Sequence, residues 1–162
     1  YHKDPATILA VLELLRKQCP DVAQRVFGGC RRPEQIPSKM YTRLPTIEQS
    51  RQIYARSKVW FVASRSEGFP APVLEAMACG CAVVATDCGG LREIITSGEN
   101  GFLVEVGDAA GMVKKIRLLL EDEQLRRRFV AKSQETVGKF VWDALIDKLE
   151  NVLLSVCNSD AT

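Results

Sequence analysis

The sequence predicts an α/β protein in which helices cover both faces of a parallel sheet, a three-layer α/β/α sandwich. Extended apolar segments alternate with helical segments through residue 106, and the loops between them are short. The apolar runs 59–63 and 82–86 lack polar alternation, which is typical of strands buried on both faces. Strands alternating with helices favour parallel units with right-handed crossovers, so the helices are divided between the two faces of the sheet.

The first third of the chain supplies two helices and two strands. Residues 6–18 carry apolar side chains at helical spacing after an Asp-Pro pair, and Pro20 ends this helix. Residues 22–29 and 39–44 are short extended runs, each closed by Gly or Pro, and we expect both to be strands. Thr46 is a helix-capping residue, so the next helix is expected from there to about residue 57.

The middle of the chain continues the alternation. Residues 59–63 form a strand, 71–79 a helix and 82–86 a second buried strand. A glycine pair at 89–90 then opens a short helix, and 101–106 is the fifth expected strand. Helical spacing alone follows: one helix around Met112–Leu120, another around Leu125–Phe129, and a last one from Trp142 to Val156.

Composition limits the class of protein. The 162 residues suffice for one domain with a core, and 46% hydrophobic with 26% charged residues is an ordinary globular mixture. The net charge of +2 gives no global basic field for nucleic acid. No apolar run approaches the roughly 20 residues of a membrane span. Because the chain starts at Tyr1 without Met or a signal pattern, we expect a piece excised from a longer protein.

The six cysteines favour reduced thiols in the cytoplasm over a disulfide framework, since a chain of this length builds a core without cross-links. Cys79-Gly-Cys81 with Cys88 fits no standard zinc spacing, and the single histidine lies at position 2. The sequence therefore predicts no metal site.

In a sheet of this Rossmann type, ligands bind at the carboxyl ends of the strands. Four Gly- or Pro-marked loops are expected at that edge: Gly28-Gly29, Pro45-Thr46, Ser64–Phe69 and Asp87–Gly90. Topology alone thus predicts a binding cleft.

The loop that follows residues 59–63 has features of an anion site. Gly68 lets the backbone approach a ligand closely, and Pro72 fits a helix start. Amides at the start of a helix attract anions such as a diphosphate. The amides expected to face the ligand are those of Gly68, Phe69, Ala71 and Val73.

Glu67 and Glu75 lie on either side of this helix start. An ionised glutamate accepts both hydrogens of a vicinal diol, so Glu75 could hold a ribose and Glu67 a sugar, on opposite sides of the diphosphate. This spacing is that of a nucleotide-sugar. The alternative is structural, because a glutamate in a first helical turn is stabilised by about 0.3–1 kcal/mol without any ligand.

A longer pattern carries a family resemblance. It comprises Glu67-Gly-Phe-Pro-Ala-Pro-Val-Leu-Glu75-Ala-Met-Ala-Cys-Gly80, Ala82–Thr86, Gly89-Gly90-Leu-Arg-Glu93, Asn100–Val104, Asp108 and Phe140-Val-Trp142. This pattern resembles the donor-binding half of glycosyltransferase family 4, retaining enzymes of the GT-B type, over roughly residues 20–156. The resemblance implies one domain over residues 1–162, the C-terminal half of a two-domain enzyme of polysaccharide biosynthesis.

The resemblance also implies roles for individual residues. In the E-x7-E motif of such enzymes the first glutamate, here Glu67, is the catalytic-site acid that binds donor-sugar hydroxyls, and the second, Glu75, binds the ribose. Main-chain amides at Gly68 and Phe69 would hold sugar and phosphate. The donor site would further include Ser64, Arg65, Gly28, Gly29 and Thr46, with Leu44-Pro45 beside the base.

The implied substrate is a nucleoside-diphosphate sugar, used without metal or other cofactor for hexosyl or deoxyhexosyl transfer. The implied partner is an N-terminal acceptor domain, without which the chain is expected to be inactive. A cytoplasmic location, with peripheral contact at the inner membrane face, is also implied. The family's Arg and Lys for the diphosphate have no convincing match: Lys3 is a weak candidate and Arg65 a better one. Arg126–Arg128 is expected to be a solvated helix face, with membrane contact as the alternative.

Other functions remain open at this point. A GT-B epimerase would need a histidine and acid constellation, and a phosphorylase relative would need a pyridoxal lysine near residues 64–75, where the sequence has none. A non-catalytic assembly or binding domain is a further alternative. A dinucleotide-binding protein is disfavoured because no G-x-G-x-x-G follows the early strand.

Overall fold

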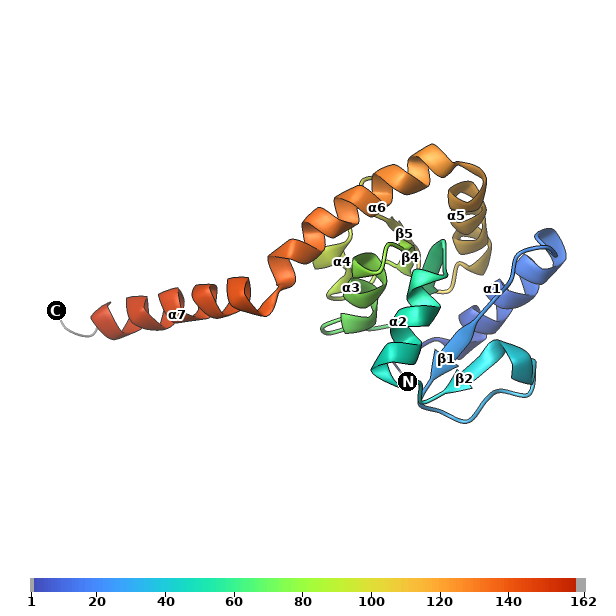
Figure 1. The fold of residues 1–162 in the computed structure, drawn as a ribbon, viewed down its shortest axis with the longest axis horizontal. Helices are drawn as coiled ribbons and strands as arrows, with labels where there is room; N and C mark the ends of the chain where they lie inside the picture. Colours follow the sequence, from blue (N-terminus) through green and yellow to red (C-terminus); the bar gives the residue numbers. More distant parts are fainter. Residues whose placement is uncertain (1, 160–162) are drawn as a thin grey trace.

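The computed structural model describes residues 2–159 and shows strands and helices in alternation, followed by helices only (Figure 1). The elements are α1 Pro5–Gln18, β1 Val26–Gly28, η1 Ser38–Met40, β2 Tyr41–Arg43, α2 Ile47–Ala55, β3 Val59–Val62, α3 Ala71–Ala78, β4 Ala82–Thr86, α4 Leu91–Ile94, β5 Phe102–Val104, α5 Ala109–Glu121, α6 Glu123–Val137, η2 Gly138–Phe140 and α7 Trp142–Ser159.

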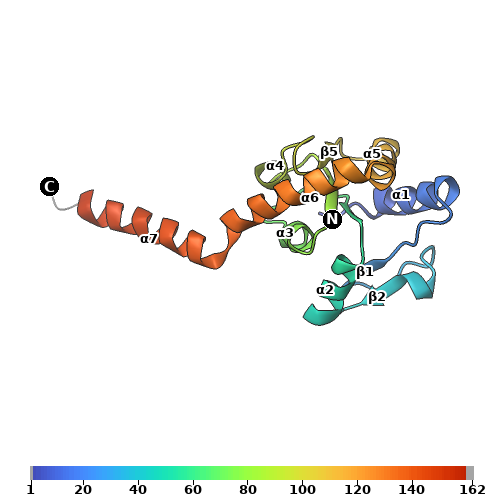
Figure 2. The same ribbon diagram turned by 45° about the horizontal axis from the view of Figure 1, so that its top comes forward.

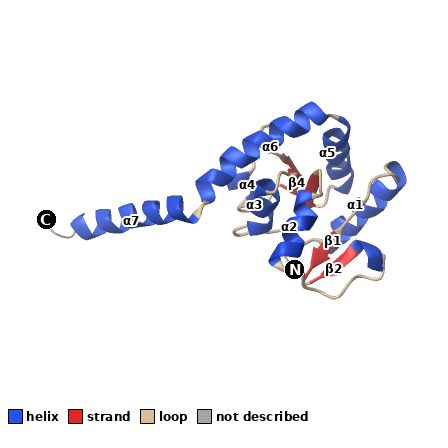
Figure 3. Cartoon of the chain, viewed as in Figure 1, coloured by secondary structure: helices blue, strands red, loops and turns tan. Residues whose placement is uncertain are grey.

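Every strand pairing between these elements is parallel, which confirms the predicted α/β class. β4 lies between β3 and β5, and β1 pairs with β2 in a separate two-stranded sheet. The rings of Phe27 on β1 and Trp60 on β3 lie 5.2 Å apart, so the two sheets are joined by side-chain packing. Figure 3 shows β4 among the helices, while β1 and β2 lie at the edge of the molecule.

Four strands are shorter than predicted. β3 ends one residue early, at Val62, and the other three are shortened because turns take up their ends. The Val22 amide donates to the Cys19 carbonyl at 3.0 Å, so β1 begins only at Val26. The Met40 amide donates to the Pro37 carbonyl, which makes 38–40 a 3-10 turn before β2. After Val104 the Asp108 amide bonds the Glu105 carbonyl, and the turn ends β5 early.

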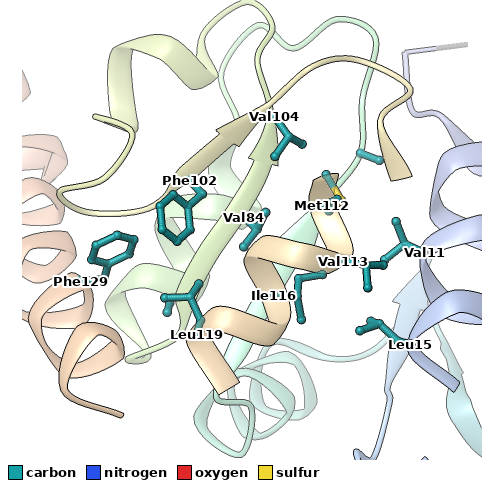
Figure 4. Packing of buried hydrophobic residues seen from close by; sticks show 12 residues of the cluster. Val11, Leu15, Val84, Phe102, Val104, Met112, Val113, Ile116, Leu119 and Phe129 are labelled. Atoms are coloured by element: carbon teal, nitrogen blue, oxygen red, sulfur yellow. The ribbon is translucent and has the colours of Figure 1, made fainter. Parts of the chain in front are cut away.

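The core lies on both faces of the β3-β4-β5 sheet. All five residues of β4 are buried, as predicted from their unbroken apolar run. On one face Val84 packs with buried side chains of α5 and α1, and Phe129 of α6 meets Phe102 edge-on at 4.9 Å (Figure 4). On the other face Val83 packs with α3, α4 and Tyr54 of α2. Packing on both faces therefore holds β4 in place, and with it the start of the loop at residues 87–90 that follows this strand.

Helix α7 extends away from the rest of the chain (Figures 1 and 2). Its side chains Ile146, Leu149, Val152 and Leu153 are each more than half exposed. The side chains of Trp142 and Val156, which the sequence assigns to this apolar stripe, lie outside those described. No helix in the described part of the chain has the length and apolar content needed to cross a membrane.

Candidate functional site

The loop after β3 begins at Ser64, whose position is set by the neighbouring strand. Ser64 is completely buried, and its amide donates to the Thr86 hydroxyl at 2.9 Å. The same hydroxyl donates to the Ser64 carbonyl at 2.8 Å. Because Thr86 is the last residue of β4, one side chain of the central strand fixes the start of the acid-bearing loop.

Glycines support the back of this loop. The Gly90 amide donates to the Glu67 carbonyl at 2.9 Å. A Cβ on Gly89 would overlap the Glu67 backbone, and one on Gly90 would overlap the Gly68 carbonyl. Gly89 also has φ +47°, in the left-handed region that favours glycine. The loop therefore packs backbone against backbone on the turn before α4, and this requires both glycines.

Glu67 is held as an ionised acceptor. Its side chain is only 12% exposed, and its Oε1 accepts hydrogen bonds from the Ser64 hydroxyl at 2.6 Å and from the Lys3 ammonium. Burial raises the pKa of Glu67, but the bonds from Lys3 and Ser64 and the charge of Lys3 outweigh it and hold the pKa below its usual value. The carboxylate therefore stays charged and orientated at neutral pH.

Two of the four amides expected to face a ligand are used inside the protein. The Ala71 amide donates to the Phe69 carbonyl at 3.0 Å, and the Val73 amide donates to the Pro70 carbonyl at 2.9 Å. These bonds tighten the first turn of α3, where Pro70 provides no side-chain cap. Among the described residues, the amides of Gly68 and Phe69 have no backbone acceptor. Of the four amides predicted to bind an anion, only those of Gly68 and Phe69 thus remain available.

Gly68 and Phe69 form the open part of the loop. Nothing lies within 4 Å of the position that a Cβ on Gly68 would occupy, so the space beside it is free for a ligand. The Phe69 side chain is 64% exposed, and its ring lies 6.4 Å from that of Phe140 in η2.

Glu75 projects from the second turn of α3 and is exposed. Its Oε2 accepts a hydrogen bond from the Tyr54 hydroxyl at 3.2 Å. Glu67 therefore lies just before α3, and Glu75 lies in its second turn. Each carboxylate accepts a hydrogen bond from a hydroxyl, that of Ser64 for Glu67 and that of Tyr54 for Glu75.

Arg65 faces the N-terminal segment. Its guanidinium pairs with the Asp4 carboxylate at 3.1 Å, and its amide donates to the His2 carbonyl at 2.8 Å. Asp4 is buried and caps α1 through the Thr7 amide at 3.3 Å. In this arrangement the guanidinium of Arg65 serves to hold residues 2–4 against the end of β3.

Gly28, Gly29 and Thr46 form a second group, at the ends of β1 and β2. The Leu44 amide donates to the Gly28 carbonyl at 2.9 Å, and the Leu44 side chain lies 3.6 Å from the Cβ position of Gly29. The Thr46 hydroxyl accepts from the Gln49 amide and so caps α2, as predicted. Leu44 is 66% exposed and adopts φ 45°, a left-handed conformation rare for leucine.

The structure adds three residues that sequence reasoning underweighted or missed. Lys3, considered only a weak candidate, contacts Glu67 across 64 positions of the chain. Tyr54 and Thr86 entered the sequence analysis only as members of a helix and a strand. The one available signal was that Thr86 ends a strand expected to be wholly apolar, where a buried hydroxyl needs partners.

The remaining candidate groups from the sequence are the cysteines and the arginines of α6. The five cysteines whose side chains are described are free thiols; Cys81 and Cys88 are buried and Cys30 is exposed. Among the side chains that the structure describes, no three His, Cys, Asp or Glu residues converge as a metal site requires. On α6, Arg127 pairs with Glu123 of the same helix, and Arg126 donates to the Leu119 carbonyl.

Solved structures of GT-B glycosyltransferases share this parallel α/β fold. The C-terminal domain of a group 1 family glycosyl transferase from Francisella tularensis matches 85% of this chain and 79% of its own, with TM-score 0.69 and 28% identity. HepE of Anabaena, solved with UDP and glucose, matches 90% of this chain and 44% of its own, with TM-score 0.75 and 24% identity.

The model of the family described as "Glycosyl transferases group 1" matches residues 1–136, and the chain belongs to this family. A sulfoquinovosyl transferase of Arabidopsis thaliana is 31% identical over 153 residues, which cover 88% of this chain and 30% of that protein. The chain therefore spans less than a third of that relative.

Proposed function

We propose that this chain is the nucleotide-sugar-binding domain of a retaining, family 4 glycosyltransferase that transfers a hexosyl or deoxyhexosyl group. The observation that carries the proposal is the arrangement at the start of α3. Two fixed carboxylates, Glu67 and Glu75, lie before and after two available amides, Gly68 and Phe69. This order matches the order sugar, diphosphate, ribose in a nucleoside-diphosphate sugar.

Glu75 is proposed to bind the ribose. Its carboxylate is exposed, and Tyr54 occupies one position on Oε2. Each carboxylate oxygen has two lone pairs, so the group can still accept both hydroxyl hydrogens of a vicinal diol. Hydrogen bonds to a charged acceptor are about twice as strong as neutral ones, which suits a residue that fixes the nucleoside.

Glu67 is proposed to hold the donor sugar and to stabilise charge as the bond to phosphate breaks. Its lowered pKa makes it an acceptor and a negative charge, and therefore unsuited to proton donation at neutral pH. Lys3 places an ammonium beside it, and we assign to that ammonium the cationic contact with the diphosphate. Arg65, the stronger candidate from sequence, is paired with Asp4 and is assigned a supporting role.

The diphosphate is proposed to sit against the amides of Gly68 and Phe69 at the positive end of α3. The open space beside Gly68 supports this placement. Because these amides, the helix end and Lys3 supply positive charge, we propose that the leaving group needs no metal ion.

The base is proposed to lie along the loops at Gly28-Gly29 and Leu44–Thr46. The Thr46 hydroxyl caps α2, so contact there would come from the backbone and from the exposed Leu44 side chain. A leucine held at positive φ is a strained residue of the kind that clusters at ligand sites.

In the proposed reaction the bond between the anomeric carbon and the diphosphate oxygen breaks, and a new bond forms to an acceptor oxygen on the same face of the sugar. The acceptor proton passes to the departing diphosphate. The acceptor is assigned to an N-terminal domain of the same cytoplasmic polypeptide, docked at the inner membrane face. The exposed apolar side chains of α7 support a further contact of this chain with another part of the protein. The isolated chain is proposed to be inactive.

A donor screen tests this function. The intact polypeptide is melted with UDP-, GDP- and ADP-sugars, and the products formed with the stabilising donor are identified by mass. UDP donors are included because HepE was solved with UDP and glucose.

Two variants then test the residue roles. Glu75→Ala is expected to weaken donor affinity by about tenfold or more, since a hydrogen bond to a charged group is lost. Glu67→Ala is expected mainly to lower turnover. Glu135→Ala, an exposed acid on α6, is the control and should change neither. Unchanged kinetics in both site variants would defeat the assignment.

A further inference from the structure

We infer that Tyr54 is the positioning residue of Glu75 and that its hydroxyl sets the selectivity of the site for ribonucleotides. The inference rests on the proposed function, because it assigns to Tyr54 the orientation of the ribose-binding acid. Its structural basis is the 3.2 Å hydrogen bond from the Tyr54 hydroxyl to Oε2 of Glu75, across 21 positions of the chain.

The hydroxyl has little freedom to move. Tyr54 is 1% exposed and lies in the last turn of α2. Phe27 of β1 meets its ring edge-on at 5.4 Å, and Trp60 of β3 does so at 5.1 Å. Rings packed edge-on from two strands fix the plane and direction of the tyrosine. Its hydroxyl is thus held in a fixed position from which it donates to the exposed carboxylate of Glu75.

An exposed glutamate does not need such a partner for its own solvation, because water satisfies it. Without the bond its three side-chain torsions would sample many rotamers, and ligand binding would have to order them. With Oε2 held by Tyr54, that ordering is complete before the nucleotide arrives, which is the usual gain from preorganisation. The effect is therefore expected in binding of the ribose hydroxyls, which Glu75 contacts, and not in the rest of the nucleotide.

Tyr54 stays protonated for this role. Burial, followed by the nearby charge of Glu75, raises the pKa of its hydroxyl far above neutrality. The ionisable groups that face it include Cys81 and Cys79 besides Glu75. Phe27, whose ring contacts that of Tyr54, directly precedes Gly28 on β1, so the packing of Tyr54 is linked to the strand that leads into the proposed base loop.

The test compares ribose with deoxyribose ligands on the intact polypeptide. Calorimetry measures the affinities of UDP, 2′-deoxy-UDP, GDP and 2′-deoxy-GDP for the wild type, Tyr54→Phe, Glu75→Gln and the double variant. Ser57→Ala, which removes a hydroxyl bonded only to the Ile53 carbonyl near the end of α2, is the matched control. Melting temperatures are recorded for all.

We expect Tyr54→Phe to weaken binding of the preferred ribonucleotide by about tenfold, with its deoxy analogue nearly unchanged. In initial-rate measurements KM for the donor should rise while kcat changes little. The double variant should bind no more weakly than Glu75→Gln, because both changes remove one function. Ser57→Ala should retain the wild-type preference for ribose.

Equal weakening of ribose and deoxyribose ligands by Tyr54→Phe would show a purely structural role and overturn the inference. Full retention of the ribose preference in Tyr54→Phe would do the same. If Glu75→Gln loses the preference for ribose while Tyr54→Phe keeps it, the inference about Tyr54 fails and the proposed role of Glu75 stands. If Glu75→Gln keeps the preference, or the wild type binds none of the four nucleotides, the proposed function itself fails.

Discussion

The Thr86 hydroxyl bonds both backbone groups of Ser64: it accepts from the amide at 2.9 Å and donates to the carbonyl at 2.8 Å. Both residues are completely buried. The side chain thus replaces the next step of the β3-β4 ladder, and the chain is released at Ser64 to form the Glu67 loop. A single hydroxyl determines where the strand ends and the candidate site begins.

Thr86→Val should therefore be strongly destabilising. The substitution keeps the shape of the side chain and leaves the buried amide of Ser64 without a partner, at about 1–3 kcal/mol. The Ser64 carbonyl loses its stronger partner and keeps only the Cys88 thiol, 3.4 Å away. Urea denaturation should show a lower free energy of unfolding by about 2 kcal/mol or more. Thr96→Val, at an exposed threonine, is the control and should change it by less than about 0.5 kcal/mol. Similar values for the two variants would contradict the role of the Thr86 hydroxyl.

The glycines of the site are expected to respond in opposite ways. Gly68 has open space beside it, so Gly68→Ala should leave the melting temperature nearly unchanged and weaken nucleotide binding. Gly90→Ala forces a methyl group into the Gly68 carbonyl and should lower the melting temperature by several degrees. Thermal melts with and without nucleotide measure both effects. A stable Gly90→Ala protein with an unmoved loop would refute the packing argument.

Removal of the Lys3 ammonium should raise the pKa of Glu67. Lys3→Met deletes the largest of the influences that lower this pKa, while the opposing effect of burial remains. Carbon-detected NMR titration of the Glu67 carboxyl gives the pKa directly, and Ser64→Ala provides the comparison for the other bond. The global stability should change little, because the Lys3 side chain is 54% exposed and such pairs contribute about 0–1 kcal/mol. An unchanged Glu67 pKa in Lys3→Met would show that the contact is absent in solution.

Asp4 should make the stability depend on acid pH. Burial raises the pKa of Asp4, but hydrogen bonds from Thr7 and the charge of Arg65 outweigh it and hold the folded-state pKa below its usual value. The ionised form thus stabilises the fold: the contribution is complete above the unfolded-state pKa and is lost as the pH falls through the folded-state pKa.

Asp4→Asn keeps a capping residue and removes this titration. The free energy of unfolding of the wild type should approach that of Asp4→Asn as the pH falls from about 5 to 2, measured by urea denaturation at each pH. A difference between the two proteins that stays constant over this range would exclude the contribution of Asp4.

Elements that are determined by neighbouring residues in the sequence were predicted correctly. The buried run at β4, the Thr46 cap and the helix starting near Ala71 all follow from neighbouring residues, and the structure places them as expected. The loop with Glu67 was found because glycine, proline and two acids stand close together in the sequence.

Contacts across long separations could not be predicted in this way. Lys3 reaches Glu67 and Tyr54 reaches Glu75 only because the sheet brings separate helices and termini together. The Ala71 and Val73 amides were expected to face outward, but the first turn of α3 closes on the carbonyls of Phe69 and Pro70. Local backbone closure competes with ligand binding for the same donors, and residue types do not reveal which one wins.

The backbone packing of Gly89 and Gly90 has a practical consequence for engineering. The shape of the Glu67 loop depends on the absence of side chains at Gly89 and Gly90, so substitutions at these two positions are expected to destabilise the loop. Ser66 and Phe69 are exposed on the same loop. Mutant libraries that aim to alter substrate preference belong at these two positions, whose side chains are exposed.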